Sequence, residues 1–322
     1  MIERYDFAPL HGITKAVYRK VWHKHFGGAD RYFIPFFSPT HHHIVTPRDF
    51  KELDPANNEG MTVVPQIMSC LAPDFIWAAE TLKELGYNEV NLNLGCPSGT
   101  VTAKGKGSGF LARLEELDRF FDEVFSKVDM PVSVKTRLGI RDPQEFAQIL
   151  EVYNRYPISC VTIHARVQKE KYRGDVHMDE FRQALAESKN PICYNGDLNT
   201  VGAVRELEEA CPGVQAVMIG RGAVADPALF RKLKGGSGAT KEELQSFMQD
   251  LYRSYEEAYD GQTATAAQRM REVWFYLIHM FEDAEKLNKK LRRFRSPAEY
   301  EMLEAAIFDQ LELRTDCQGD LI

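Results

Sequence analysis

The sequence lacks the features that mark several classes of protein. No apolar stretch approaches the roughly 20 residues of a membrane-spanning helix, because the longest aromatic-rich run covers only 274–281. The 6 cysteines form no C-x-x-C pair, and several lie in apolar runs, as thiols do in a reducing compartment. No positively charged segment followed by an apolar one opens the chain, so no signal peptide is expected. We therefore predict a soluble, cytoplasmic protein that does not bind membranes, and we expect it to be a monomer.

Positive charge is also scarce, since 40 Lys and Arg face 47 Asp and Glu, for a net charge of −7. This balance excludes long-range attraction of the whole surface to nucleic acid but leaves room for a local basic patch. With 44% hydrophobic residues, the 322-residue chain has enough apolar material for a large core, which excludes a disordered protein.

Short β-branched segments alternate with helical patterns from the start of the chain to about residue 235. The predicted strands are 5–8, 32–36, 62–67, 89–94, 132–136, 160–164, 192–194 and 216–219. Helix start signals lie between them, as at Asp142-Pro143 and Asp226-Pro227. Eight such units predict a (β/α)8 TIM barrel, of the α/β class. A doubly wound open sheet is the alternative, because the helix after the second strand is short.

The pattern changes at the glycine-rich segment 235–238, and no strand is predicted after it. Thr240 and Glu243 form a capping box that opens a new helix. Helical periodicity then continues over about 241–260, 264–292 with one break, and 296–311. We predict a catalytic barrel at 1–235 and a small all-α helical bundle domain at 240–322.

Polar side chains lie where the predicted strands end. Strand side chains alternate between two faces, so Asn91 and Asn93 point into the barrel. The same face of other strands carries Gln66, Ser133, Lys135, Arg137, Thr162, His164 and Asn195. A barrel interior is normally aliphatic, and burying an unpartnered amide or ammonium costs several kcal/mol. Each could be a hydrogen-bonded core residue, but their shared placement on five strands predicts a polar ligand site.

Glycines follow the last two predicted strands, in Asn195-Gly196-Asp197 and in Gly220-Arg221-Gly222. Glycine lets backbone N–H groups approach an anion, and an arginine adds charge-assisted hydrogen bonds. Loops after the seventh and eighth strands are the usual phosphate position in TIM barrels. The sequence therefore predicts a phosphate-binding site there.

One segment of the fourth unit, Asn91-Leu92-Asn93-Leu94-Gly95-Cys96-Pro97, places a cysteine at the mouth of a strand. It resembles the signature of the tRNA-dihydrouridine synthases, the FMN enzymes of the dihydrouridine synthase family. Further motifs of that family follow in order at 8–14, 65–67, 134–139, 162–166, 194–198 and 219–223. They cover nearly all of the barrel, and the helical tail matches the family's second domain in size and place.

The resemblance implies an enzyme that reduces the C5–C6 double bond of specific uridines in tRNA, with FMN recycled by NADPH or NADH. It assigns the cofactor to Pro9, Leu10, His11, Gln66, Lys135, His164, Asn195, Gly196, Asp197, Gly220 and Arg221. It places Asn93, Arg137 and Arg166 beside the target uracil and makes Cys96 the general acid. No metal is implied. Leu10 and His11 depart from the methionine and small residue usual in the family, outside the reacting groups.

The thiol of Cys96 suits this role, because an unperturbed cysteine, with a pKa of about 8.5, is protonated near neutrality yet releases its proton readily. A stacked base cannot reach a barrel mouth, so the uridine must be extruded into the site. The competing interpretation of Cys96 is a buried structural thiol.

The resemblance places Lys135 at the pyrimidine edge of the flavin. A positive charge at that edge tunes the cofactor, so replacing Lys135 would remove this influence.

Two further clusters admit two interpretations each. The run of Lys286, Lys289, Lys290, Arg292, Arg293 and Arg295 is a solvated face or a contact for tRNA phosphates, and we favour the phosphates. His41, His42 and His43 could bind a metal, but adjacent histidines in an extended loop point in different directions, so we favour a solvated or RNA-facing loop.

Three other functions are compatible with parts of the sequence. One is an FMN barrel oxidoreductase acting on a free pyrimidine, like dihydroorotate dehydrogenase, which would not need a basic helical domain. Another is a non-catalytic RNA-binding protein on a barrel scaffold. A flavin-free sugar-phosphate enzyme is the third, and Gln66 with Lys135 disfavours it.

Overall fold

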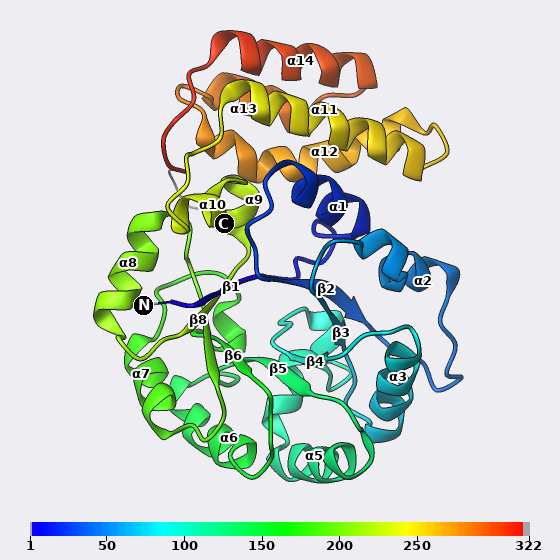
Figure 1. Ribbon diagram of the computed structural model, residues 1–322, viewed down its shortest axis with the longest axis vertical. Coiled ribbons are helices and arrows are strands. Elements are labelled where there is room, and N and C mark those ends of the chain that lie inside the picture. The colour runs from blue at the N-terminus through cyan, green and yellow to red at the C-terminus, as the bar shows by residue number, and fades with distance from the viewer. Residues whose placement is uncertain (1, 318–322) are drawn as a thin grey trace.

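The computed structural model describes residues 2–317, in which parallel strands close into a barrel (Figure 1). The strands are β1 (Arg4–Phe7), β2 (Arg31–Phe37), β3 (Val63–Ile67), β4 (Val90–Leu94), β5 (Val132–Arg137), β6 (Val161–His164), β7 (Ile192–Asn195) and β8 (Ala216–Ile219). β1 pairs with β2 on one side and with β8 on the other. This closure confirms the TIM barrel and excludes the doubly wound sheet.

Helices surround the barrel and connect its strands (Figure 1). They are α1 (Ala16–His25), α2 (Pro47–Leu53), α3 (Ala72–Glu84), α4 (Gly99–Thr102), α5 (Leu114–Lys127), α6 (Phe146–Tyr153), α7 (Met178–Glu187), α8 (Val201–Ala210), α9 (Arg221–Ala225) and α10 (Leu229–Leu233). Short 3-10 turns lie at Pro55–Asn58, Gly107–Ala112, Pro143–Glu145 and Gln168–Glu170. The start signal at Asp142 opens a 3-10 turn before α6, and the one at Asp226 precedes α10, which begins at Leu229.

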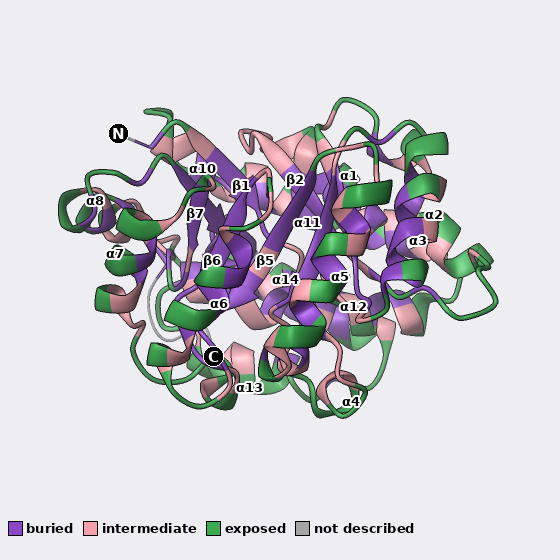
Figure 2. Ribbon diagram, turned by 90° about the horizontal axis from the view of Figure 1, so that it is seen from below, coloured by how far each residue is buried: buried purple, intermediate pink, exposed green. Residues whose placement is uncertain are grey.

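The barrel interior is layered from one end to the other. At the amino-terminal end, the buried carboxylate of Asp6 accepts two hydrogen bonds from Arg31 and lies 3.3 Å from Nε of Arg4. A small apolar layer follows, formed by Ala8, Phe33, Val64, Cys160, Cys193, Ala216 and Met218. Polar side chains occupy the carboxyl ends of the strands. Figure 2 shows the strands as buried and the outer helix faces as exposed.

The last four α-helices of the described residues form a bundle on one side of the barrel (Figure 1). They are α11 (Lys241–Ala258), α12 (Thr263–Leu277), α13 (Glu285–Leu291) and α14 (Pro297–Gln310). The capping box of Thr240 and Glu243 is present at the start of α11. The predicted helix over 264–292 breaks at the 3-10 turn Ile278–Met280.

Aromatic rings join the bundle to the barrel. Phe247 of α11 packs edge-on against Tyr18 of α1, with ring centroids 6.0 Å apart, and against Phe26, at 5.2 Å. Lys24 adds an ion pair to Asp250 of α11, and His25 Nε2 adds a hydrogen bond to the same carboxylate at 2.9 Å. The barrel therefore fixes where α11 lies, and α12 packs between α11 and α9.

Glu304 on α14 places a carboxyl group in the bundle core, where it accepts a hydrogen bond from Tyr300. Burial raises the pKa of Glu304 to about 7. An acid with a raised pKa favours the folded state only while it is protonated, so stability falls as pH rises from about 4.5 to about 7.

We expect the Glu304→Gln variant to escape this loss, since a glutamine amide is neutral at every pH and still accepts a hydrogen bond from Tyr300. By the linkage between pKa and stability, its advantage over the wild type should grow from near zero at low pH to about 3 kcal/mol above neutrality. Urea unfolding at pH 4.5 and pH 8 measures this. A difference that is the same at both pH values would contradict the assignment.

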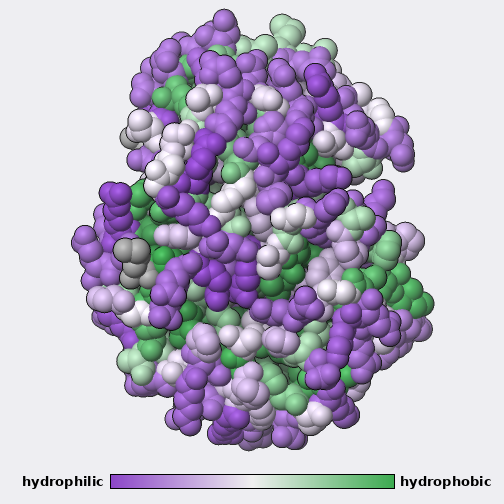
Figure 3. Space-filling view, in the orientation of Figure 1, coloured by the Kyte–Doolittle hydropathy of each residue, from purple (hydrophilic) through white to green (hydrophobic). Residues whose placement is uncertain are grey.

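Hydrophilic side chains cover most of the face shown in Figure 3, with smaller hydrophobic areas between them. Among residues 2–317, no helix combines the length and apolar character needed to cross a membrane.

Candidate active site

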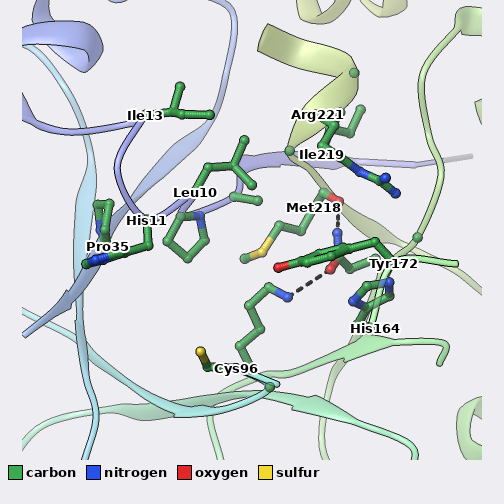
Figure 4. A pocket seen from close by; sticks show the side chains of 18 of the residues that line it. Leu10, His11, Ile13, Pro35, Cys96, His164, Tyr172, Met218, Ile219 and Arg221 are labelled. Atoms are coloured by element: carbon green, nitrogen blue, oxygen red, sulfur yellow. Dashed lines mark hydrogen bonds between the residues drawn. The ribbon is translucent and has the colours of Figure 1, made fainter. Parts of the chain in front are cut away.

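A cavity of about 290 Å³ opens at the carboxyl ends of the strands. Its walls come from strands β2 to β8, from the loops after β1, β4, β6, β7 and β8, and from Tyr276 of α12. Figure 4 shows several of the lining side chains, among them Leu10, Cys96 and Arg221. Of the residues predicted for the site, it is lined by Pro9, Leu10, His11, Gln66, Asn93, Cys96, Lys135, Arg137, His164, Asn195, Gly196, Asp197, Gly220 and Arg221. Segments that are far apart in the sequence, such as those of Pro9 and Arg221, thus meet at one opening, as the strand alternation predicts.

A chain of amides connects the lower part of the cavity to the barrel interior. Asn93 Nδ2 donates to Gln66 Oε1 at 2.6 Å, and Gln66 Nε2 donates to Asn91 Oδ1 at 2.7 Å. Asn91 Nδ2 continues the chain to Ser133 Oγ at 3.0 Å. These bonds satisfy the buried amides, so the polar barrel interior is stable and holds Asn93 in one orientation.

Asn93 in turn fixes the backbone that carries Cys96. Its Oδ1 accepts hydrogen bonds from the N–H groups of Gly95, at 3.1 Å, and Cys96, at 2.9 Å. The carbonyl of Cys96 accepts a bond from Ser108 Oγ at 2.8 Å, from across the glycine-rich segment. Gly107 allows this approach, because a Cβ there would lie 2.8 Å from that same carbonyl oxygen. The thiol is therefore held at the cavity wall by contacts from two directions.

The thiol of Cys96 is kept protonated by its surroundings. Burial raises its pKa, and the hydrogen bond from the backbone of Ser98 and the nearby charges of Arg137 and Lys135 only partly oppose that rise. A thiol with a raised pKa is a proton donor rather than a nucleophile at neutral pH. The structure thus supports the chemistry of a general acid at this position.

Lys135 of β5 reaches into the cavity, where its Nζ donates to Asn195 Oδ1 at 2.8 Å, a bond drawn in Figure 4. Asn195 is itself oriented by its bond to the carbonyl of Met218, at 2.7 Å. Burial and the neighbouring charge of Arg137 lower the pKa of Lys135 to about 7. An anion beside Nζ would favour the charged form of Lys135 and so raise this pKa again.

Arg137 and His164 form the next part of the wall. Arg137 donates from Nε to the carbonyl of Gly95, at 2.8 Å, and from Nη1 to that of Val167, at 3.0 Å. Burial lowers its pKa to about 10. His164 is held neutral, since burial and the surrounding cations lower its pKa well below the ordinary value. A neutral imidazole can donate one hydrogen bond and accept another.

The carboxylate of Asp197 lies between two arginines. Arg221 Nη2 donates to Oδ1 at 2.7 Å, and Arg166 donates to both oxygens. Arg166 also bonds the carbonyl of Gly174 and approaches His164 Nε2 at 3.3 Å. Its side chain is 2% exposed and does not line the cavity. Arg166 thus lies behind Asp197 and His164, outside the lining of this cavity, and its contact with uracil stays a prediction.

The residues that line the cavity favour an anionic ligand. Three of them are cations, namely Lys135, Arg137 and Arg221, while Asp197 is the one carboxylate among the described lining residues. The loops after β7 and β8 also approach closely, because a Cβ at Gly222 would overlap the carbonyl oxygen of Leu198. A low-dielectric opening with excess positive charge attracts phosphate or another anion.

Several lining residues were not predicted from the sequence. Tyr172, in the loop after β6, lies over the guanidinium groups of Arg137, at 5.4 Å, and Arg221, at 5.3 Å. Phe36 stacks on His11 with centroids 4.8 Å apart, and Tyr276 reaches the cavity from α12. Strand alternation could not identify Tyr172 or Tyr276, because both lie outside strands and reach the site only through tertiary folding.

The three adjacent histidines lie in the loop after β2. His43 bonds Asp74 Oδ1 at 3.1 Å and stacks on Trp77, with centroids 4.9 Å apart. Within residues 2–317, no group of three or more His, Cys, Asp or Glu side chains is arranged to hold a metal ion. The contacts of His43 hold the loop after β2 against α3.

A model of the dihydrouridine synthase family matches residues 6–312 of the chain. The probable tRNA-dihydrouridine synthase 1 of Synechocystis sp. is 29% identical over 315 residues, 93% of this chain and 85% of that protein. The tRNA-dihydrouridine synthase B of Pasteurella multocida is 27% identical over 232 residues, 72% and 69% of the two chains. Among solved structures, morphinone reductase superposes with a TM-score of 0.51 at 14% identity, over 74% of this chain and 87% of its own. That last similarity concerns the fold.

Proposed function

The chain belongs to the dihydrouridine synthase family and is a tRNA-dihydrouridine synthase, and we propose that it binds FMN in this cavity and uses Cys96 as its general acid. NADPH or NADH would be the reductant, and the enzyme would act in the cytoplasm as a monomer. The observation that carries the proposal is that the Cys96 thiol and the Lys135 ammonium line one cavity at the carboxyl ends of the strands.

The donor set of the cavity fits FMN. A flavin mononucleotide carries a phosphate and a planar ring that gains negative charge on reduction. Arg221, beside the close-packed loops of Gly196 and Gly220, would hold the phosphate. Lys135 would lie at the ring edge that becomes negative, and the uncharged Pro9 and Leu10 would contact the ring. Cys96 and Arg221 lie on opposite sides of the cavity in Figure 4, so the two ends of the cofactor would have separate partners.

When bound, FMN would supply the hydride for carbon 6 of the uracil, with reducing equivalents drawn from the nicotinamide. The chain supplies the rest. Cys96 donates the proton to carbon 5, from a thiol that burial keeps protonated. Asn93 holds the backbone of Cys96, and Arg137 holds the carbonyl of Gly95, so the donor is oriented before the substrate arrives. The half-buried position of Cys96 requires the uridine to leave its stack.

Purified protein tests this proposal directly. With FMN, NADPH and unmodified tRNA, the wild type should form dihydrouridine at defined positions, which mass spectrometry of the digested tRNA measures. Free uridine and orotate should not be reduced at comparable rates, because they lack contacts with the helical bundle. Turnover of a free pyrimidine but not of tRNA would favour the alternative of a small-molecule barrel oxidoreductase.

The helical bundle is proposed to bind tRNA through its basic run. Lys286, Lys289, Lys290, Arg292, Arg293 and Arg295 are all exposed on α13 and the turn that follows. Their charge contrasts with the net charge of −7 of the chain. Each phosphate contact lowers the slope of log affinity against log salt concentration by roughly 0.7–0.9.

We expect reversal of Lys289, Lys290, Arg292 and Arg293 to glutamate to weaken tRNA binding at least tenfold at about 0.1 M salt and to flatten its salt dependence. Filter binding over a salt series measures both. The control reverses four exposed cations of the barrel helices and loops, Lys127, Arg155, Lys189 and Arg205. If both variants show the same slope, the bundle is not the phosphate-binding surface.

A further inference from the structure

A second cavity, of about 430 Å³, lies beside the active site. The loop after β1 contributes His11 and Ile13 to it, and α12 and α13 contribute Phe275, Tyr276 and Asn288, with Arg292 at its rim. His11, Ile13 and Tyr276 also line the first cavity. The two cavities therefore share a wall, and a ligand that spans both would contact barrel and bundle together.

The chemistry of this second cavity is that of a base-stacking site. The guanidinium of Arg292 lies over the ring of Phe275, 5.6 Å from its centroid, and this side chain forms no hydrogen bond or ion pair within residues 2–317. Phe275 is half-buried, with one face toward the cavity region and Tyr276 edge-on at 5.0 Å. An aromatic ring beside an arginine plane is a common platform for an unstacked nucleobase.

One polar group of the same cavity is available to a ligand. The side-chain amide of Asn288 makes no hydrogen bond within the described residues, although it can both donate and accept. The neighbouring Arg271 is already engaged, because its Nη2 donates to the carbonyl of Phe294 at 2.7 Å and its guanidinium lies over the Phe294 ring, 4.2 Å from the centroid. Asn288 can therefore bond the polar edge of a ligand in this cavity.

We propose that this second cavity binds the base of an unpaired nucleotide next to the target uridine in tRNA. The inference rests on the proposed function, and it adds a second point of recognition to it. Stacking would come from Phe275 and Arg292, and the amide of Asn288 would bond the base edge. A nucleotide adjacent to the uridine fits because the shared wall brings the two cavities next to one another.

The adenine of the reductant is another base that could stack in this cavity. Charge and position favour a base of the tRNA over it. The cavity borders α13, which carries the exposed basic run, so a polyanion that contacts this run passes the cavity rim. Two half-reactions separate these sources. Reduction of the bound flavin by NADPH without tRNA reports on the reductant, and tRNA affinity with product formation reports on the tRNA.

The test compares Arg292→Gln and Asn288→Leu with Arg293→Gln, which removes the same charge from the neighbouring residue outside the cavity. The two cavity variants should raise the Kd for tRNA and lower kcat/KM for tRNA about tenfold, as loss of a stacked base does. Arg293→Gln should change both by roughly threefold or less, as expected for one exposed phosphate contact. Flavin reduction by NADPH should be equally fast in the wild type and in Arg292→Gln.

Modified tRNA adds an independent readout. Removing the base 5′ or 3′ of the target uridine should weaken wild-type binding about tenfold for one of the two abasic tRNAs. Arg292→Gln should bind that abasic tRNA no worse than it binds intact tRNA, because the contact is already lost.

Three results would overturn the inference. One is an increase in the Kd for tRNA that is no larger in Arg292→Gln than in Arg293→Gln. Another is that Arg292→Gln binds the abasic tRNA about tenfold more weakly than it binds intact tRNA, so that the two losses multiply. The third is slower flavin reduction in Arg292→Gln, which would assign the cavity to the reductant. A wild type that makes no dihydrouridine would instead refute the proposed function, so the two failures are distinguishable.

Discussion

The Cys96→Ala variant is expected to bind FMN and to accept hydride from NADPH at the wild-type rate, yet to form dihydrouridine about 1,000-fold more slowly, a typical loss for a general acid. The thiol lines the cavity, and burial raises its pKa, so it is protonated when the substrate arrives. Without it, carbon 5 has no proton donor held at a fixed position. Stopped-flow absorbance separates flavin reduction from flavin reoxidation by tRNA, and only reoxidation should slow.

A second half-buried cysteine provides the control. Cys70 follows β3, and its Sγ lies 3.7 Å from the carbonyl of Lys104, but it does not line the cavity. Cys70→Ala should therefore keep the reoxidation rate. Cys96→Ser should fall between wild type and alanine, because a hydroxyl of similar size releases its proton less readily than a thiol. Equal reoxidation rates for Cys96→Ala and the wild type would instead support the alternative interpretation of Cys96 as a structural thiol.

Strand alternation was sufficient to locate most of the cavity. The side chains of Asn93, Lys135 and His164 lie on the inner face because residues two apart on a strand share a face. Parallel closure then brings the carboxyl ends of all strands to one end, so local pattern and global fold agree here. The roles assigned to these residues came from the family motifs, and they remain proposals to be tested by substitution.

Arg166 shows where the pattern stops being informative. It follows His164 by two residues, so alternation alone would place its side chain near the same opening. The chain leaves β6 at His164, however, and the guanidinium turns to Asp197 and the carbonyl of Gly174. The partners that decide its direction lie in other loops, and sequence spacing contains no information about those contacts.

The second cavity could not be predicted for a similar reason. Trp274, Phe275 and Phe281 suggest a bundle core, and Trp274 and Phe281 are indeed buried. Phe275 is only half-buried, because α12 lies between α11 and the barrel and turns this residue toward the loop after β1. Its exposure depends on how the bundle packs against α1 and α9, which helical periodicity does not specify.

Lys135→Met is expected to slow flavin reduction by NADPH about 100-fold, because it removes the positive charge placed where the reduced ring becomes negative. The Lys135 ammonium also couples cofactor binding to pH. Burial lowers its pKa to about 7 in the cavity, so the side chain is charged below that pH and neutral above it. Binding of an anionic cofactor raises this pKa again, which means that binding takes up a proton when the pH is above about 7.

The sign of the pH dependence follows from this proton uptake. FMN affinity of the wild type should be constant below about pH 7 and should weaken above it, by up to about tenfold per pH unit, until the pKa of the bound form is reached. Lys135→Met should bind FMN less tightly at pH 6 and should lose this slope, because it has no proton to take up. Flavin fluorescence titrations from pH 6 to pH 9.5 measure both. His164, Cys96 and Arg137 remain in the variant, so a slope that persists in Lys135→Met would assign the proton to one of them and remove Lys135 from contact with the cofactor.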